Sequence, residues 1–205
     1  GHSAFSIDNF TADRSKLGLT FEQVEALMAN HQFAAERLYS GLTASDVYVN
    51  EKIPFGFDYA DYDPDVFPIK SDHGTHVSGI VAGKDDTITG VAPNAQLVEM
   101  KIFSDLESSA RASWILGALE DCVVLGVDVI NLSIGTSCGF SRENDKEWQS
   151  GVYDKIRERG ISLVVAASNS FNSAYGSEKN GNLGLTSNPD TGTVGSPSTY
   201  EGAMS

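Results

Sequence analysis

Alternating apolar and amphipathic segments constrain the fold of this chain more than any other feature of its sequence. Three segments are apolar almost throughout and are predicted to be buried strands, at residues 95–103, 127–135 and 161–169. Two helices are predicted between them, at residues 109–126 and 143–160, and each ends at a glycine. Apolar strands that alternate with helices are typical of a parallel sheet covered on both faces. The sequence therefore predicts an α/β fold with a mostly parallel sheet between two layers of helices.

The segments outside this pattern are more varied. Residues 20–40 carry apolar side chains at helical spacing, which predicts one amphipathic helix. Residues 52–60 are predicted to form a strand, and residues 61–68 an acidic loop that contains proline. Residues 171–193 are rich in Asn, Gly and Ser and are predicted to form a long surface loop.

Composition excludes several classes of function. The formal net charge is −14, and no basic stripe is present that could neutralise phosphates, so a nucleic-acid partner is not expected. No apolar run approaches the roughly 20 residues that span a bilayer, so no transmembrane segment is expected. Two cysteines, Cys122 and Cys138, are too few for a disulfide framework and are predicted to be free thiols.

Polar or glycine-bearing residues follow three of the predicted strands. They are Phe103-Ser104, Ser133-Ile134-Gly135 and Ser168-Asn169. In open α/β sheets, ligands bind beyond the carboxyl ends of the strands. The three strand ends are therefore expected to converge on one edge of the sheet, and the chemistry is expected there.

The segment HGTHVSGIVAG, at residues 73–83, is predicted to form a helix that begins at His73. Ser71 and Asp72 are available to cap its N-terminus. The small residues leave one helix face nearly bare, so another stretch of backbone can pack closely against it. The N-terminus of a helix carries partial positive charge, which favours a neutral imidazole able to accept a proton. The alternative is a tightly packed helix in which His73 is an ordinary buried polar residue.

This segment resembles the histidine signature of the subtilisin-like serine peptidases. The resemblance continues, in the order found in that family, through GVAPNAQLVEMKIF, GVDVINLSIG, GISLVVAASN and GTVGSPSTY. The long insertion before His73 and the PDTGTVGSPST stretch are similar to the lactocepin-type cell-envelope branch. The resemblance implies part of a subtilisin-like three-layer fold, a polypeptide substrate, and a secreted or cell-surface location in bacteria.

The resemblance also implies roles for individual residues. His73 would be the general base of a Ser–His–Asp triad, and Asn169 the side-chain donor of the oxyanion hole. The segment Ser133-Ile134-Gly135 would bind substrate as an added strand. Ser104 would belong to the opposite wall of the cleft. The family usually has glycine where Ser168 precedes the asparagine, so the chain departs from the family at a position that affects the backbone conformation of the oxyanion hole.

Two motifs of the triad are absent from residues 1–205, namely D-[ST]-G around the aspartate and G-T-S-[MA]-[AS]-P around the serine. Asp8 lies in a sequence that resembles the stretch after the family's aspartate, so we expect that aspartate upstream of Gly1. The serine is expected downstream of Ser205. Residues 1–205 are then one partial catalytic domain. It comprises an insertion-bearing part at residues 1–70 and a β/α core with the histidine helix at residues 71–205. The chain alone is expected to be inactive, and its partners include the missing parts of the same domain.

Three alternatives remain open. The first is a non-catalytic module that keeps the peptide groove. The second is a metal hydrolase that uses His73 and His76, although zinc peptidases have the spacing H-E-x-x-H. The third concerns cofactors: none is expected for the triad chemistry, but Asp61, Asp63 and Asp65 alternate in the acidic loop and could bind calcium. The loop lacks the glycine and the distal glutamate of an EF-hand, which favours a solvated acidic loop.

Overall fold

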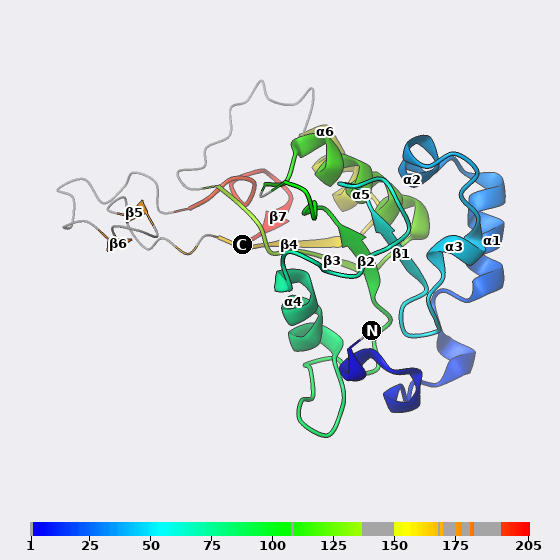
Figure 1. Ribbon diagram of the computed structural model, residues 1–205. Coiled ribbons are helices and arrows are strands. Elements are labelled where there is room, and N and C mark those ends of the chain that lie inside the picture. The colour runs from blue at the N-terminus through cyan, green and yellow to red at the C-terminus, as the bar shows by residue number, and fades with distance from the viewer. Residues whose placement is uncertain are drawn as a thin grey trace. The chain divides into compact units, whose positions relative to one another are not determined.

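The computed structural model (Figure 1) describes residues 2–107, 109–136, 150–167, 169, 175–177, 181–182 and 194–205. The chain forms two compact units, Gly1–Leu125 (unit 1) and Gly126–Ser205 (unit 2). Within the described residues, no helix combines the length and the apolar character of a membrane-spanning segment. Most of the predicted loop at residues 171–193 lies outside the described residues. Cys138 lies outside them as well.

A two-stranded parallel sheet forms the centre of unit 1. Strand β1 (Phe55–Asp58) pairs in parallel with β2 (Val98–Lys101), in register from Phe55↔Val98 to Asp58↔Lys101. Every residue of β1 is buried. Successive side chains of a strand point to opposite faces, so Phe55 and Phe57 lie on one face and Asp58 on the other.

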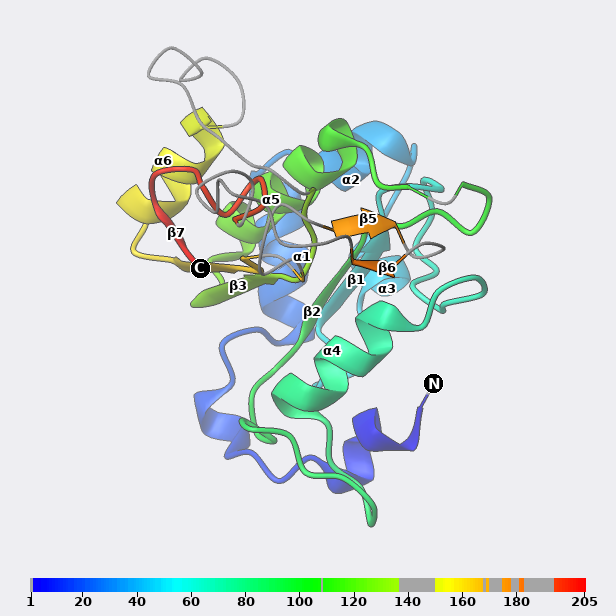
Figure 2. The same cartoon turned by 90° about the vertical axis from the view of Figure 1, so that its left-hand side faces the viewer.

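Helices cover both faces of this sheet. On the phenylalanine face, the ring of Phe33 stacks on Phe55 at 5.6 Å, in the group formed by α1 (Phe21–Asn30), α2 (Ala34–Leu38), α3 (Ala44–Val47) and α5 (Ala112–Leu125). On the other face, α4 (His73–Ala82) lies beside β2 (Figure 2), where the Ser78 hydroxyl donates to Glu99 Oε2 at 3.2 Å. Three short 3-10 helices, Ser3–Phe5, Ile7–Asn9 and Arg14–Lys16, precede α1.

The single helix predicted for residues 20–40 is wrong, because the chain breaks it into α1 and α2. His31 ends α1 in extended conformation, with φ −133°. The break follows from a residue distant in sequence. Asp121 on α5 accepts the backbone N–H groups of Ala34 and Ala35 at 2.6 and 2.9 Å, and so starts a new helix there. Asp121 is fully buried, and burial raises the pKa of its carboxyl despite these hydrogen bonds.

Helix α5 confirms the prediction for residues 109–126 apart from its first turn. It ends at Leu125 and is followed by Gly126, whose φ of +67° is the left-handed conformation that glycine adopts most readily. Gly117 of α5 faces Ala34 of α2 and the ring of Tyr59, and a Cβ there would lie 3.4 Å from each. Cys122 is a free, buried thiol, and burial raises its pKa to about 12.

Unit 2 contains a second parallel sheet, in the order β3 (Val129–Leu132), β4 (Ser162–Val165), β7 (Ala203–Met204). Helix α6 (Ser150–Glu158) packs against β4 and is followed by Gly160, with φ +72°. The strands β5 (Tyr175–Ser177) and β6 (Gly181–Asn182) form an antiparallel pair. The first part of the predicted helix at residues 143–160 lies outside the described residues.

The parallel α/β fold class is confirmed, with one difference in unit 2. Strands β3 and β4 alternate between exposed and buried residues: Val129 is 59% exposed and Val164 36%, whereas Ile130 and Leu163 are buried. The described residues therefore cover only one face of this pair. An apolar strand composition does not distinguish a strand buried on both faces from one whose second face has no cover within the described residues.

Candidate active site

His73 is the first residue of α4, as the sequence predicts, and its side chain is exposed. Asp72 occupies the N-cap position and accepts the N–H of His76 with its backbone carbonyl at 3.0 Å, but its side chain makes no capping hydrogen bond. His76 is exposed as well. The imidazole of His73 therefore stands at an open helix N-terminus, where a reacting group can reach it.

The small residues of α4 serve close backbone packing at its C-terminal half. The turn at residues 88–92 runs along the helix, and the N–H groups of Gly90, Val91 and Ala92 donate to the carbonyls of Gly83, Ile80 and Val81. A Cβ on Gly90 would lie 2.8 Å from Gly79 O and from Ala82 N. Glycine is required at this point, and the predicted close approach to a bare helix face is confirmed.

Ser104 lies just beyond β2, but its hydroxyl is used within the chain. The residue is 4% exposed, and its Oγ donates to Asp61 Oδ1 at 2.5 Å while accepting from the N–H groups of Leu106 and Glu107. A contact between Ser104 and a bound peptide therefore falls to its backbone. Its role in substrate binding stays a prediction.

A lysine and two aspartates form an ion-pair network at the same edge of unit 1. Lys101 Nζ lies 2.7 Å from Asp58 Oδ2 and 2.6 Å from Asp105 Oδ2. Burial raises the pKa of Asp58, and Lys101 offsets this only in part. The hydrogen bond from Lys101 lowers the pKa of Asp105. Burial alone would lower the pKa of Lys101, but the two carboxylates outweigh it and hold that pKa above its usual value.

Of the three aspartates of the acidic loop that were considered as calcium ligands, only Asp61 lies in a group of neighbouring carboxylates among the described residues. In the part of the chain that the structure describes, one group of three ligand residues lies within 4.8 Å, namely Asp58, Asp61 and Asp105. Asp63 and Asp65 instead accept backbone N–H groups within their own loop. The group contains neither His73 nor His76, and calcium binding stays a prediction.

In unit 2, two of the predicted strand ends lie side by side. Strands β3 and β4 are parallel, and the N–H of Ala166 donates to Leu132 O at 3.1 Å, so both chains leave the sheet at the same edge. Ser133 and Ile134 are half-buried there, and Gly135 and Asn169 are exposed. The convergence expected for these two strand ends is confirmed, whereas Ser168 lies outside the described residues.

Gly135 has a structural role in addition to the predicted one. A Cβ there would lie 2.9 Å from Ser196 O. The neighbouring Thr136 exchanges two backbone hydrogen bonds with Ser196, at 2.8 and 3.0 Å. Glycine at this position therefore lets residues 194–196 approach the end of β3.

The predicted site residues divide between the two units. His73 and Ser104 belong to unit 1, and Ser133, Ile134, Gly135 and Asn169 belong to unit 2. That His73 and Asn169 act in one catalytic site stays a prediction. Sequence reasoning missed Asp105 and Lys101, although Asp105 directly follows the Ser104 that it singled out at the end of β2.

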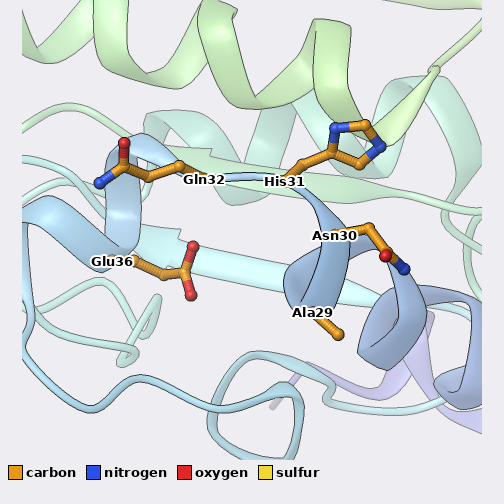
Figure 3. A pocket seen from close by; sticks show the side chains of 5 residues that line it. All are labelled: Ala29, Asn30, His31, Gln32 and Glu36. Carbon is orange, nitrogen blue, oxygen red and sulfur yellow. The ribbon is translucent and has the colours of Figure 1, made fainter.

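A surface hollow of about 410 Å³ lies elsewhere in unit 1 (Figure 3). Its walls come from the end of α1 and the start of α2, and it includes no predicted site residue. Glu36, one of its lining residues, accepts the N–H of Phe33 at 2.8 Å and so caps α2. The hollow is a consequence of the helix break and adds nothing to the candidate site.

Comparison with known proteins gives consistent matches. The subtilase family model matches residues 26–205. The chain is 36% identical over 166 residues to the PI-type proteinase of Lactococcus lactis subsp. cremoris, covering 76% of this chain and 9% of that protein. It is 33% identical over 174 residues to the C5a peptidase of Streptococcus pyogenes serotype M6, covering 80% of this chain and 14% of that protein.

Solved structures agree with this at the level of the fold. A lanthipeptide protease matches with a TM-score of 0.53 and 19% identity, over 78% of this chain and 43% of its own. A mutant of the protease domain of PatA matches with a TM-score of 0.51 and 24% identity, over 65% and 42%. The chain spans less than a sixth of the length of the two curated relatives described here.

Proposed function

The chain belongs to the subtilase family of serine peptidases, and from this premise we propose that it supplies the general base and an oxyanion donor of a serine endopeptidase. The observation that carries the proposal is the exposed His73 ring at the N-terminus of α4, within a segment that matches the family's histidine signature. The substrate is a polypeptide.

In the proposed reaction, the imidazole of His73 takes the proton of a serine hydroxyl as that oxygen attacks the scissile carbonyl. The same imidazolium then gives the proton to the leaving amine. The side-chain amide of Asn169 donates a hydrogen bond to the carbonyl oxygen as negative charge develops on it. The exposure of Asn169 supports this role, because a substrate oxygen has to reach the amide.

The segment Ser133-Ile134-Gly135 binds the substrate backbone in this proposal. It continues from β3 at the carboxyl edge of the unit 2 sheet, where an extended peptide can add by main-chain hydrogen bonds. Ser104 contributes its backbone to the opposite wall. A secreted or cell-surface location is proposed from the family resemblance.

The triad works as a unit, and removal of any one member leaves only residual catalysis. Neither the aspartate motif nor the serine motif of the family is present among the 205 residues. We therefore propose that the chain alone does not hydrolyse peptides, and that the nucleophile and the orienting carboxylate come from other parts of the parent protein.

The test uses the product of the full-length gene, with a fluorophosphonate probe for an activated serine and a fluorogenic peptide for turnover. The expected result is labelling and hydrolysis by the wild-type protein, and loss of both in His73→Ala. His31→Ala is the matched control, since it removes another exposed histidine of unit 1. An unlabelled wild-type protein that still binds peptide would identify a non-catalytic binding module. Hydrolysis by the 205-residue chain alone, dependent on His73, would contradict the proposed division of the triad.

A further inference from the structure

The segment that leads into α4 is bonded to the end of β2 in both directions. Asp61, which follows β1, accepts the N–H of Asp105 at 2.7 Å. Asp105, which follows β2, accepts the N–H groups of Ile69 and Lys70 through its Oδ1, at 3.1 and 3.0 Å. The ammonium of Lys70 also donates to Leu106 O at 3.2 Å. These hydrogen bonds hold the segment between β1 and α4 against the residues that follow β2.

The carboxylate of Asp105 is itself held in place. Its second oxygen pairs with Lys101 Nζ at 2.6 Å, and both side chains are mostly buried, with exposed fractions of 16% and 14%. Lys101 belongs to β2 and also pairs with the buried Asp58 of β1. The two N–H groups of residues 69 and 70 are therefore bound to an acceptor that is anchored on the sheet.

His73 lies three residues after Lys70, and the start of its helix has no side-chain cap of its own. The chain that enters the first turn of α4 is held by the hydrogen bonds of Ile69 and Lys70 to the residues after β2, whereas the later turns are held by Ser78 and by residues 88–92. We propose that Asp105 is a positioning residue for His73: by binding the N–H groups of Ile69 and Lys70 it fixes where α4 begins and where the imidazole stands. This inference rests on the proposed role of His73 as general base.

Unit 1 provides a matched control at the other end of α4. Asp85 also accepts two backbone N–H groups through one oxygen, those of Thr87 and Ile88, at 2.8 and 3.0 Å. The substitutions Asp105→Ala and Asp85→Ala therefore each remove a carboxylate that accepts two backbone N–H groups, one set before the histidine helix and one set after it. Asp105→Ala also removes the ion pair with Lys101. Asp105→Asn keeps an acceptor oxygen and loses the charge.

The first measurement is hydrogen exchange in the full-length protein, resolved for residues 73–78 and 79–84. Asp105→Ala is expected to speed exchange in residues 73–78 by about tenfold, as a local opening, with little change in the strands. Asp105→Asn is expected to restore most of the protection, and Asp85→Ala to leave residues 73–78 unchanged. Equal acceleration throughout unit 1, or none in residues 73–78, would overturn the proposal.

The second measurement is steady-state peptide hydrolysis by the same variants. In Asp105→Ala, misplacement of the base is expected to lower kcat about tenfold, while KM stays within about twofold of the wild-type value. The reason is that a misaligned base stabilises the transition state less well but has little effect on substrate binding. Asp105→Asn should recover most of kcat. An unchanged kcat, or a rise in KM alone, would overturn the positioning role. A wild-type protein without any activity refutes the proposed function, while the exchange data still decide whether Asp105 fixes the start of α4.

Discussion

The hydroxyl of Tyr59 donates to Oδ2 of Asp121 at 2.7 Å, and neither side chain reaches solvent. Through this bond and the two N–H groups of α2 that it accepts, the carboxylate of Asp121 joins the end of β1, the start of α2 and the middle of α5. Removal of such an acceptor leaves three buried donors unpaired.

Asp121→Ala is expected to lower the free energy of unfolding by about 3 kcal/mol or more, because unpaired buried donors and a cavity add to the loss. Urea unfolding followed by circular dichroism measures this. Glu120→Ala is the control, since the neighbouring Glu120 pairs with Arg37 at 2.5 Å with both side chains about half exposed. It should change stability by less than about 1 kcal/mol. Equal effects of the two substitutions would contradict the assigned role of Asp121.

The buried Lys52 is expected to raise the free energy of unfolding of the protein at alkaline pH. The residue is 2% exposed, and burial lowers the pKa of its ammonium to about 8. The unfolded chain therefore binds this proton more tightly than the folded protein does, and stability increases as pH rises from about 8 towards the ordinary lysine value. The contribution is about 2 kcal/mol between pH 7.5 and 10.

The measurement is the difference in unfolding free energy between wild type and Lys52→Met across that pH range. The variant should lack the alkaline gain. Lys16→Met, at a side chain 80% exposed, should follow the wild-type curve. Parallel curves for wild type and Lys52→Met would show that the lysine titrates normally in the folded protein.

Gly90→Ala is expected to destabilise unit 1 by about 2–3 kcal/mol, because the new methyl group would meet rigid backbone. Its Cβ would lie 2.8 Å from two backbone atoms of α4 and 2.9 Å from the backbone N of Gly83, which follows the helix. Gly74→Ala is the matched control within the same region. Apart from its chain neighbours and the backbone of its own helix, no atom of the described residues lies within 4 Å of a Cβ at Gly74, so this change should stabilise the helix by about 0.5–1 kcal/mol. Thermal unfolding of both variants decides, and opposite signs are expected.

Asn169→Ala is expected to lower kcat of the full-length protein by about 10²–10³-fold, with KM nearly unchanged, because the donor acts mainly on the charge of the transition state. Asn131→Ala is the control, an exposed asparagine on β3 whose amide donates to Ser133 Oγ at 2.9 Å. Its effect should be confined to KM. A loss in KM alone for Asn169→Ala would assign that residue to substrate binding.

The sequence predicted correctly those helix ends that depend on residues at the ends themselves. Helix α4 begins at His73 as expected, and Gly126 and Gly160 adopt the left-handed conformation that follows a helix end. The parallel pairing of β3 with β4 also agrees with the sequence, because apolar strands that alternate with helices are typical of a parallel sheet.

Interactions between distant residues could not be predicted in the same way. The break between α1 and α2 depends on Asp121, which lies 87 residues from Ala34. The buried hydroxyl of Ser104 depends on Asp61, in a different loop. Spacing shows which residues share an element, but the partner of a polar side chain is set by the tertiary structure.

Two aspartates bind the backbone on either side of the helix that carries His73: Asp105 accepts the N–H groups of residues 69 and 70 before it, and Asp85 accepts those of residues 87 and 88 after it. For protein engineering, the stability of the helix's ends can therefore be changed separately from the residues on the helix itself. Substitution of Asp105 or Asp85 changes the hydrogen bonds that hold the chain next to α4, and it leaves the sequence of α4 intact. A designer could therefore loosen or stiffen the histidine's support without editing the signature segment itself.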